Sequence, residues 1–125
     1  MNESSAGAGG AENYSPEVVH LYERLKSVNE KRGYFFNPDL PMTMDLIAGL
    51  ITNKERYGYM CCPCRLAAND READRDIICP CDYRTPDVEE YGACYCALYV
   101  SQEWIDGAIP HLTVPERRPP EKQGW

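Results

Sequence analysis

The feature that most constrains this chain is the crowding of its cysteines. All seven lie between Cys61 and Cys96, and the flanking segments contain none. In a reducing compartment, such a cluster is more often a metal-binding or catalytic site than a disulfide framework, and an odd number leaves one thiol outside any full pairing. The cysteines therefore mark a functional site in the second half of the chain.

The amino-terminal segment lacks the features of a targeting signal, which indicates a protein that stays in a reducing compartment. The segment MNESSAGAGGAENYS has neither a positively charged start nor an apolar run, so we predict neither a secretory signal nor a membrane anchor. No apolar stretch of membrane-spanning length follows it. We therefore expect a cytoplasmic protein that is not associated with a membrane.

Composition limits the classes of partner. The length of 125 residues and the hydrophobic share of 43% are ordinary for one globular domain. The net charge of -7 argues against non-specific nucleic-acid binding, which depends on clustered Lys and Arg. A local basic surface near the cysteines remains a hypothesis, resting on Lys54, Arg56, Arg65, Arg71, Arg75 and Arg84.

Helix signals surround the cysteines. The first predicted helix is capped by Ser15, begins at Pro16 and stops at Gly33, with Val18, Tyr22, Leu25 and Val28 at helical spacing. The second is capped by Thr43 and ends before Asn53, with an apolar stripe of Leu46, Ile47, Leu50 and Ile51. Two shorter helices are predicted at Asn69–Asp76, capped by Asn69, and from Thr85 to Tyr91.

The sequence pattern predicts one folded domain between two tails. No strand alternation is long enough to indicate a sheet. Residues 1–14 are expected to form a disordered tail and residues 15–106 a single, mainly α domain of short helices and loops. Residues 107–125 are expected to be an irregular Pro-rich tail, either wrapped on the domain or loose.

Six of the cysteines form three Cys-x-Cys pairs, Cys62-Pro63-Cys64, Cys79-Pro80-Cys81 and Cys94-Tyr95-Cys96. A residue before proline is held extended, and in an extended chain residues i and i+2 point to the same side. A 4Fe-4S cluster takes four thiolates, so three pairs leave two thiols over. If these come from different pairs, they could lie next to each other and next to the iron.

The pattern resembles a known family. The order Cys-Pro-Cys-Arg, Cys-Pro-Cys and Cys-x-Cys, after a helix with Gly49-Leu50, is similar to the catalytic chain of ferredoxin:thioredoxin reductase and its bacterial and archaeal ferredoxin:disulfide reductase relatives. The resemblance extends from about Ser15 to Ser101. It implies a small, mainly α domain folded around one 4Fe-4S cluster.

The resemblance also implies roles for the cysteines. The cluster ligands would be Cys62, Cys79, Cys81 and Cys94. Cys64 and Cys96 would form the active-site disulfide, with Cys64 as the thiolate that attacks a target. Such an enzyme passes single electrons from ferredoxin through the cluster to this disulfide, which reduces thioredoxin or a similar protein. Nothing in the sequence requires a second subunit.

Two departures from the family pattern indicate the non-photosynthetic branch. Tyr95 stands where the photosynthetic enzymes have a histidine, and the pairs are separated by fourteen and twelve residues. Neither His20 nor His111 is an obvious substitute, and both are expected to be surface or packing residues.

The remaining residues near the pairs have simpler expected roles. Arg65 either lowers the pKa of Cys64 or is a solvated surface charge. Cys61 is expected to be a partly buried thiol that points away from the cluster. Apolar cover for the site is expected from Tyr57, Tyr59, Tyr83, Tyr91 and Tyr99.

Two other functions fit parts of the pattern. Four thiolates also suit tetrahedral zinc in a structural interaction module, although single-residue spacers are unusual there. A simple 4Fe-4S electron carrier would leave Cys64 and Cys96 idle.

Overall fold

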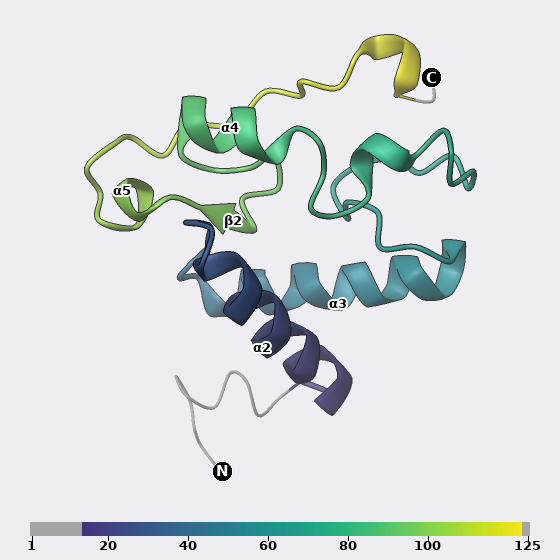
Figure 1. Cartoon of the computed structure of the whole chain (residues 1–125), viewed down its shortest axis with the longest axis horizontal. Helices are drawn as coiled ribbons and strands as arrows, with labels where there is room; N and C mark the ends of the chain where they lie inside the picture. Colours follow the sequence, from purple (N-terminus) through teal and green to yellow (C-terminus); the bar gives the residue numbers. More distant parts are fainter. Residues whose placement is uncertain (1–13, 124–125) are drawn as a thin grey trace.

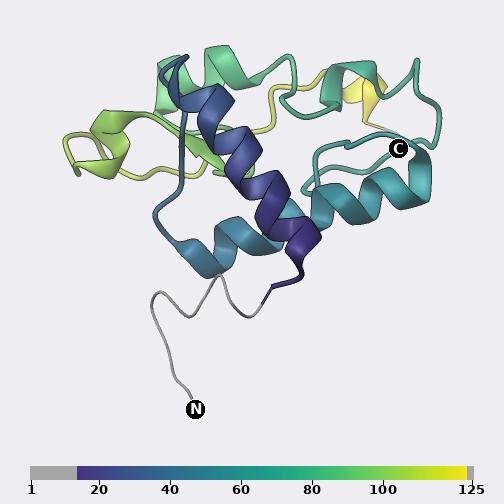
Figure 2. The same ribbon diagram turned by 60° about the horizontal axis from the view of Figure 1, so that its bottom comes forward.

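Two crossed helices form the scaffold of the molecule. The computed structural model describes residues 14–123, so the disordered tail expected for residues 1–14 lies almost wholly outside the described residues. Helix α2 (Pro16–Glu30) lies across helix α3 (Leu40–Tyr57) in both views (Figures 1 and 2). The prediction of a mainly α domain is confirmed.

Helix α2 begins where the sequence predicts. The Ser15 hydroxyl accepts a hydrogen bond from the Val18 amide at 3.3 Å, and Pro16 occupies the first turn. The chain leaves the helix through Gly33, whose φ of 87° is in the left-handed region. One expected apolar position is wrong, because Val28 is 47% exposed while Asn29 is buried in its place.

Helix α3 is longer than predicted at both ends. Its cap is Asp39, whose carboxylate accepts a hydrogen bond from the Met42 amide at 3.2 Å. Thr43 is instead a buried core residue, and its hydroxyl donates to the Asn37 carbonyl at 2.7 Å. The helix continues past Asn53 to Tyr57 and ends at Gly58. The prediction of a Thr43 cap was therefore wrong, because a stronger cap with a following proline lies upstream.

The two shorter helices differ from prediction to different degrees. Residues 69–76 do not form an α-helix, since Asn69 has a positive φ of 59° and only Arg75–Ile77 forms a 3₁₀ helix. Helix α4 (Arg84–Tyr91) ends at Gly92 as predicted, but it begins one residue before Thr85.

A two-stranded sheet connects the helices to the third cysteine pair. Strand β1 (Phe35–Phe36) runs antiparallel to β2 (Tyr99–Val100), with Phe35 opposite Val100 and Phe36 opposite Tyr99. Helix α5 (Gln102–Ile105) follows directly. The sequence predicted no sheet, because strands of two residues are too short to show alternation.

The main hydrophobic core joins the two helices to this sheet. It is made of Val18, Leu21, Phe36, Met44, Ile47, Leu50, Cys94, Leu98 and Tyr99. The Phe36 ring stacks on Tyr22 and on Tyr99, with centroids 5.0 and 5.5 Å apart. The helical scaffold therefore packs directly against the segment that carries the third cysteine pair.

The segment after α5 wraps around the domain. From residue 107 to residue 123 its only helical turn is the 3₁₀ helix Pro120–Lys122. It runs past α4 toward the cysteine loops (Figure 1), and both Val114 and Arg118 are buried. Within residues 14–123, no helix combines the length and apolar character needed to cross a bilayer.

Candidate active site

Backbone pairing brings the first two cysteine pairs together. The Cys62 amide donates to the Ile77 carbonyl at 2.8 Å, and the Cys79 amide donates to the Met60 carbonyl at 2.8 Å. Each segment continues directly into its Cys-Pro-Cys sequence. The two loops therefore start side by side, although they lie far apart in the sequence.

The third pair is held by a tight turn next to β2. The Cys94 amide donates to the Tyr99 carbonyl at 2.9 Å, and the Ala97 amide donates to the Cys94 carbonyl at 2.8 Å. The Cys94 sulfur also accepts a hydrogen bond from the Tyr99 amide at 3.3 Å. This turn, packed on the main core, places the third pair opposite the first two.

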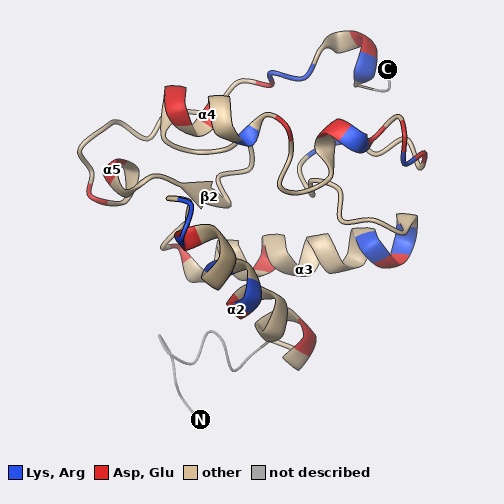
Figure 3. Ribbon diagram, in the orientation of Figure 1, with Lys and Arg blue, Asp and Glu red and all other residues tan. Residues whose placement is uncertain are grey.

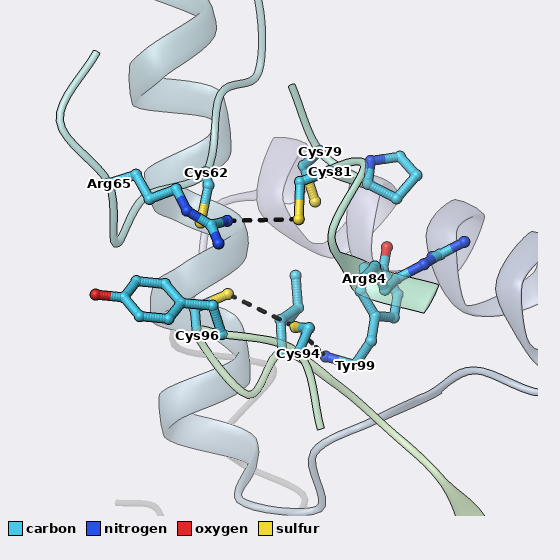
Figure 4. Close-up of a pocket in the computed structure, with 11 residues that line it drawn as sticks. Cys62, Arg65, Cys79, Cys81, Arg84, Cys94, Cys96 and Tyr99 are labelled. Atoms are coloured by element: carbon cyan, nitrogen blue, oxygen red, sulfur yellow. Dashed lines mark hydrogen bonds between the residues drawn. The ribbon is translucent and has the colours of Figure 1, made fainter. Parts of the chain in front are cut away.

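Five cysteine side chains line one cavity. They are Cys62, Cys79, Cys81, Cys94 and Cys96, which include all four predicted cluster ligands. Figure 4 shows their sulfur atoms arranged around a common space, with Tyr99 and Arg65 at its edge. In the part of the chain described, no three His, Cys, Asp or Glu side chains converge as a single metal ion needs. The thiols surround a volume, and soft thiolate donors in this number suit an iron-sulfur cluster.

Cys64 lies outside this cavity and is exposed. It lines an adjoining surface pocket of about 250 Å³ together with Tyr95, Leu66 and Glu116. Its thiol is nevertheless near enough to the thiols of Cys62 and Cys96 for them to be the main causes of its pKa shift. Cys64 and Cys96 thus lie next to each other at the boundary between the inner cavity and the surface.

The two thiols at this boundary differ in acidity. Contacts with the Cys62 and Cys96 thiols, with a smaller effect of the Arg65 guanidinium, lower the pKa of Cys64 to about 3. Contacts with the Cys62, Cys64 and Cys94 thiols raise the pKa of Cys96 well above its ordinary value. Burial raises the pKa of Cys79. The exposed thiol is therefore the one that ionises most readily, as an attacking thiol should.

Arg65 is buried beside the site, so the interpretation as a solvated surface charge was wrong. Its side chain is only 2% exposed and forms a two-point ion pair with Glu116, at 2.8 and 2.7 Å. The remaining nitrogen, Nη1, donates to the Cys81 sulfur at 3.4 Å. The guanidinium also lies over the Tyr95 and Tyr83 rings, 4.5 and 5.2 Å from their centroids.

A buried polar network supports the loop between the first two pairs. Arg118 donates to both carboxylate oxygens of Asp76, at 2.8 and 3.1 Å, and to the Ala73 carbonyl at 3.0 Å. The Tyr83 hydroxyl donates to Asp76 at 2.6 Å, and the Tyr59 hydroxyl donates to the buried Asp74 at 2.6 Å. Tyr59 and Tyr83 therefore anchor the loop through their hydroxyls and are more than apolar cover.

Helix α3 lies against the first cysteine pair at Gly49. A Cβ atom at this position would lie 3.0 Å from the Pro63 Cβ, between Cys62 and Cys64. A glycine is therefore needed here for space and not for a special backbone angle.

Several other expectations concern residues away from the cavity. Cys61 is fully buried against Tyr59 and Ile77 and does not line it. Both histidines are exposed, and His111 stacks on the Trp104 ring. Of the six residues of the expected basic surface, Arg65 and Arg84 are buried, whereas Lys54, Arg56, Arg71 and Arg75 are exposed at the end of α3 and in the next loop (Figure 3).

Sequence reasoning missed Glu116 and Arg118. Both lie in the segment expected to be an irregular tail, and their partners Arg65 and Asp76 precede them by 51 and 42 positions. No local pattern connects such distant residues. The only sequence signal is the run Glu116-Arg117-Arg118 itself, which reads as an ordinary solvated stretch.

Comparison with known proteins gives a consistent result. A family model described as the ferredoxin thioredoxin reductase catalytic beta chain matches residues 12–114. The ferredoxin-thioredoxin reductase catalytic chain of Guillardia theta is 30% identical over 94 residues, covering 74% of this chain and 88% of that protein. The catalytic chain of Pyropia yezoensis is 32% identical over 92 residues, covering 70% and 75%.

Proposed function

Because the chain belongs to the ferredoxin thioredoxin reductase catalytic beta chain family, we propose that it reduces a disulfide of a thioredoxin-like protein with electrons from a ferredoxin. As a member of this family, the chain is an oxidoreductase that acts on disulfides. The observation that carries the proposal is the position of Cys64 and Cys96, which lie near each other where the inner cavity meets the surface.

The inner cavity supports a 4Fe-4S cluster as the cofactor. Its four ligands would be Cys62, Cys79, Cys81 and Cys94, whose thiols surround the same space. When bound, the cluster would supply one-electron chemistry beside a disulfide whose reduction needs two electrons. Tyr99 and Leu98 line the cavity and exclude water from it.

The protein thiols would carry out the exchange with the target. The Cys64 thiolate attacks one sulfur of the target disulfide, and a mixed disulfide forms while the other target sulfur leaves as a thiolate. The Cys96 thiolate then attacks the Cys64 sulfur, which releases the second target thiol and forms the Cys64–Cys96 disulfide. Two electrons from the donor and two protons return both cysteines to thiols. The exposure of Cys64 and the burial of Cys96 support this division of roles.

We also assign the chain to the non-photosynthetic branch and to the cytoplasm. Tyr95, which stands at the family histidine position, lies over Arg65, so its ring supports the guanidinium next to the site. An acidic ferredoxin would dock on the exposed basic residues at the end of α3 and in the next loop (Figure 3). The sequence requires no second subunit, and this stays a prediction.

Replacing each of the two exchange cysteines tests the proposal. In Cys64→Ser and Cys96→Ser, we expect the reduction of thioredoxin by reduced ferredoxin to fall to background while the cluster is still assembled. Cys61→Ser is the matched control, because Cys61 does not line the cavity, and it should keep its activity. Unchanged turnover in both exchange variants would contradict the proposal and favour a simple electron carrier.

A further inference from the structure

We propose that Glu116 is a positioning residue that holds the Arg65 guanidinium against the Cys81 sulfur and thereby sets the reduction potential of the site. This inference rests on the proposed function, since it takes Cys81 to be a cluster ligand. In this proposal Glu116, a residue of the C-terminal segment, acts on the cofactor through Arg65.

The ion pair between Arg65 and Glu116 fixes the guanidinium in one orientation. Two nitrogens of Arg65 donate to the two carboxylate oxygens of Glu116, at 2.8 and 2.7 Å. Such a planar bidentate contact fixes the orientation of the guanidinium as well as its distance from the carboxylate. The nitrogen left over, Nη1, then points at the Cys81 sulfur at 3.4 Å. Figure 4 shows this contact at the edge of the cavity.

Glu116 is itself held in place by its neighbours. Its Oε1 atom also accepts a hydrogen bond from the Arg118 amide at 2.9 Å. The Arg118 side chain, 2% exposed, is in turn fixed on Asp76. A continuous set of contacts therefore runs from the polar network through Glu116 and Arg65 to the sulfur of Cys81.

The rings of Tyr95 and Tyr83 cover the Arg65 guanidinium and shield it from water. The centroids of the Tyr95 and Tyr83 rings lie 4.5 and 5.2 Å from the guanidinium carbon, and the Arg65 side chain is almost fully buried. A buried guanidinium without its carboxylate is strongly unfavourable, so it would turn toward water if Glu116 were lost. The hydrogen bond to Cys81 would be lost with it.

Glu116 lies in a part of this chain that the family match does not cover. The family model ends at residue 114, whereas Glu116 and Arg118 follow it. The contact between Glu116 and Arg65 therefore joins a residue inside the family match to one outside it.

The direction of the effect follows from charge. An N–H donor to a ligand sulfur stabilises the reduced, more negative state and raises the reduction potential. Removing the negative charge of Glu116 would, by Coulomb interaction alone, also raise it. Losing Arg65 from its position would lower it. Two substitutions that remove the same charge, but differ in whether they can still hold Arg65, separate these effects.

The experiment compares Glu116→Gln with Glu116→Ala in the cluster-loaded full chain. Glutamine keeps an oxygen that can accept from Arg65, whereas alanine keeps none, so we expect a lower midpoint potential in the alanine variant than in the glutamine variant. The matched controls are Glu90→Gln and Glu90→Ala, because exposed Glu90 pairs with Arg117 in the same segment. The two Glu90 variants should have the same midpoint potential.

Each outcome bears on a defined claim. Equal potentials in the two Glu116 variants would overturn the positioning role while leaving the reductase function intact. If the alanine variant does not assemble a cluster, Arg65→Lys, which lacks the planar guanidinium, should have a lower midpoint potential than wild type. An unchanged midpoint potential would overturn the inference. A wild-type protein that holds no cluster would remove the proposed function and this inference together.

Discussion

The two crossed helices and the cysteine loops are stabilised by different interactions. Helices α2 and α3 bury apolar side chains such as Leu21, Ile47 and Leu50. The region from residue 59 to residue 87, which includes the first turn of α4, buries charged groups such as Asp74 and Arg84 as well as apolar ones such as Ile77. The scaffold therefore depends on non-directional apolar burial, whereas the site depends on directional contacts between residues far apart in sequence.

This difference explains how the two regions should respond to change. An apolar core loses stability in proportion to the side-chain volume removed. A buried ion pair is more sensitive, because removing one partner leaves the other charged group without compensation. The loops should therefore be the part of the molecule where a single polar substitution has the largest effect.

The largest effect is expected for Arg118→Ala. This change leaves Asp76 without its two hydrogen bonds from Arg118, so we expect a loss of about 3–5 kcal/mol in the free energy of unfolding. Urea unfolding followed by circular dichroism measures it. The control is Lys26→Ala, which removes the exposed Lys26–Glu30 pair of α2 and should change stability by less than about 0.5 kcal/mol. Similar losses in both variants would show that the loops do not depend on buried charge.

Ile47→Ala tests the helical region in the same way. Ile47 is fully buried in the main core, so its truncation should cost about 3 kcal/mol. Amide hydrogen exchange should show that the loss is shared by α2 and α3, whose apolar residues form one cluster. An effect confined to the cysteine loops would contradict the division into two regions.

The division also explains which parts of the fold could be predicted from the sequence. The start of α2 at Ser15 and the end of α4 at Gly92 were predicted correctly, because caps are encoded within a few residues. The start of α3 was not, because Thr43 looks like a cap in sequence but is buried by its contact with Asn37. Local signals were reliable where no tertiary contact competed with them.

The candidate site shows the same limit. The repetition of the Cys-x-Cys pairs identified six cysteines, and five of them line the cavity. Which four of them bind a cluster stays a prediction. The burial of Arg65 could not be predicted, because its partner Glu116 comes 51 positions later in a stretch that reads as a tail. The two-stranded sheet was missed for a related reason, since Phe36 and Tyr99 pair over a long separation with almost no local pattern.

A smaller effect is expected for Gly49→Ala, at the junction of the two regions. Alanine is favoured over glycine in a helix by about 1 kcal/mol, but its Cβ would press on Pro63 at 3.0 Å. We expect a net loss of about 1 kcal/mol, because overpacking typically costs about 1–3 kcal/mol. The comparison variant is Ala48→Gly, one residue earlier, which should cost about 1 kcal/mol in helix propensity and also lose the contact of the Ala48 methyl group with the main core. A clear gain in stability for Gly49→Ala would show that the first cysteine pair moves freely away from α3.

The smallest effect is the response to acid. Burial tends to raise the pKa of Asp76, but hydrogen bonds from Arg118 and Tyr83 outweigh it and hold the pKa below its ordinary value. A lowered folded-state pKa means that the unfolded state binds more protons, so this contribution is present above about pH 4 and is lost as the pH falls through the folded pKa.

Comparison with Asp76→Asn isolates this contribution. The difference in unfolding free energy between wild type and the variant should shrink as the pH is lowered from 6 toward 3. A difference that grows on acidification would contradict the assignment of Asp76 as a charged partner of Arg118.

The central claim, that the cysteine loops close around an iron-sulfur cluster, is tested most directly by purifying the protein without oxygen and analysing its metals. The four proposed ligand cysteines around one cavity predict a brown protein with about four irons and four sulfides per chain. A colourless protein with one zinc per chain would contradict the account and leave a structural zinc module in its place.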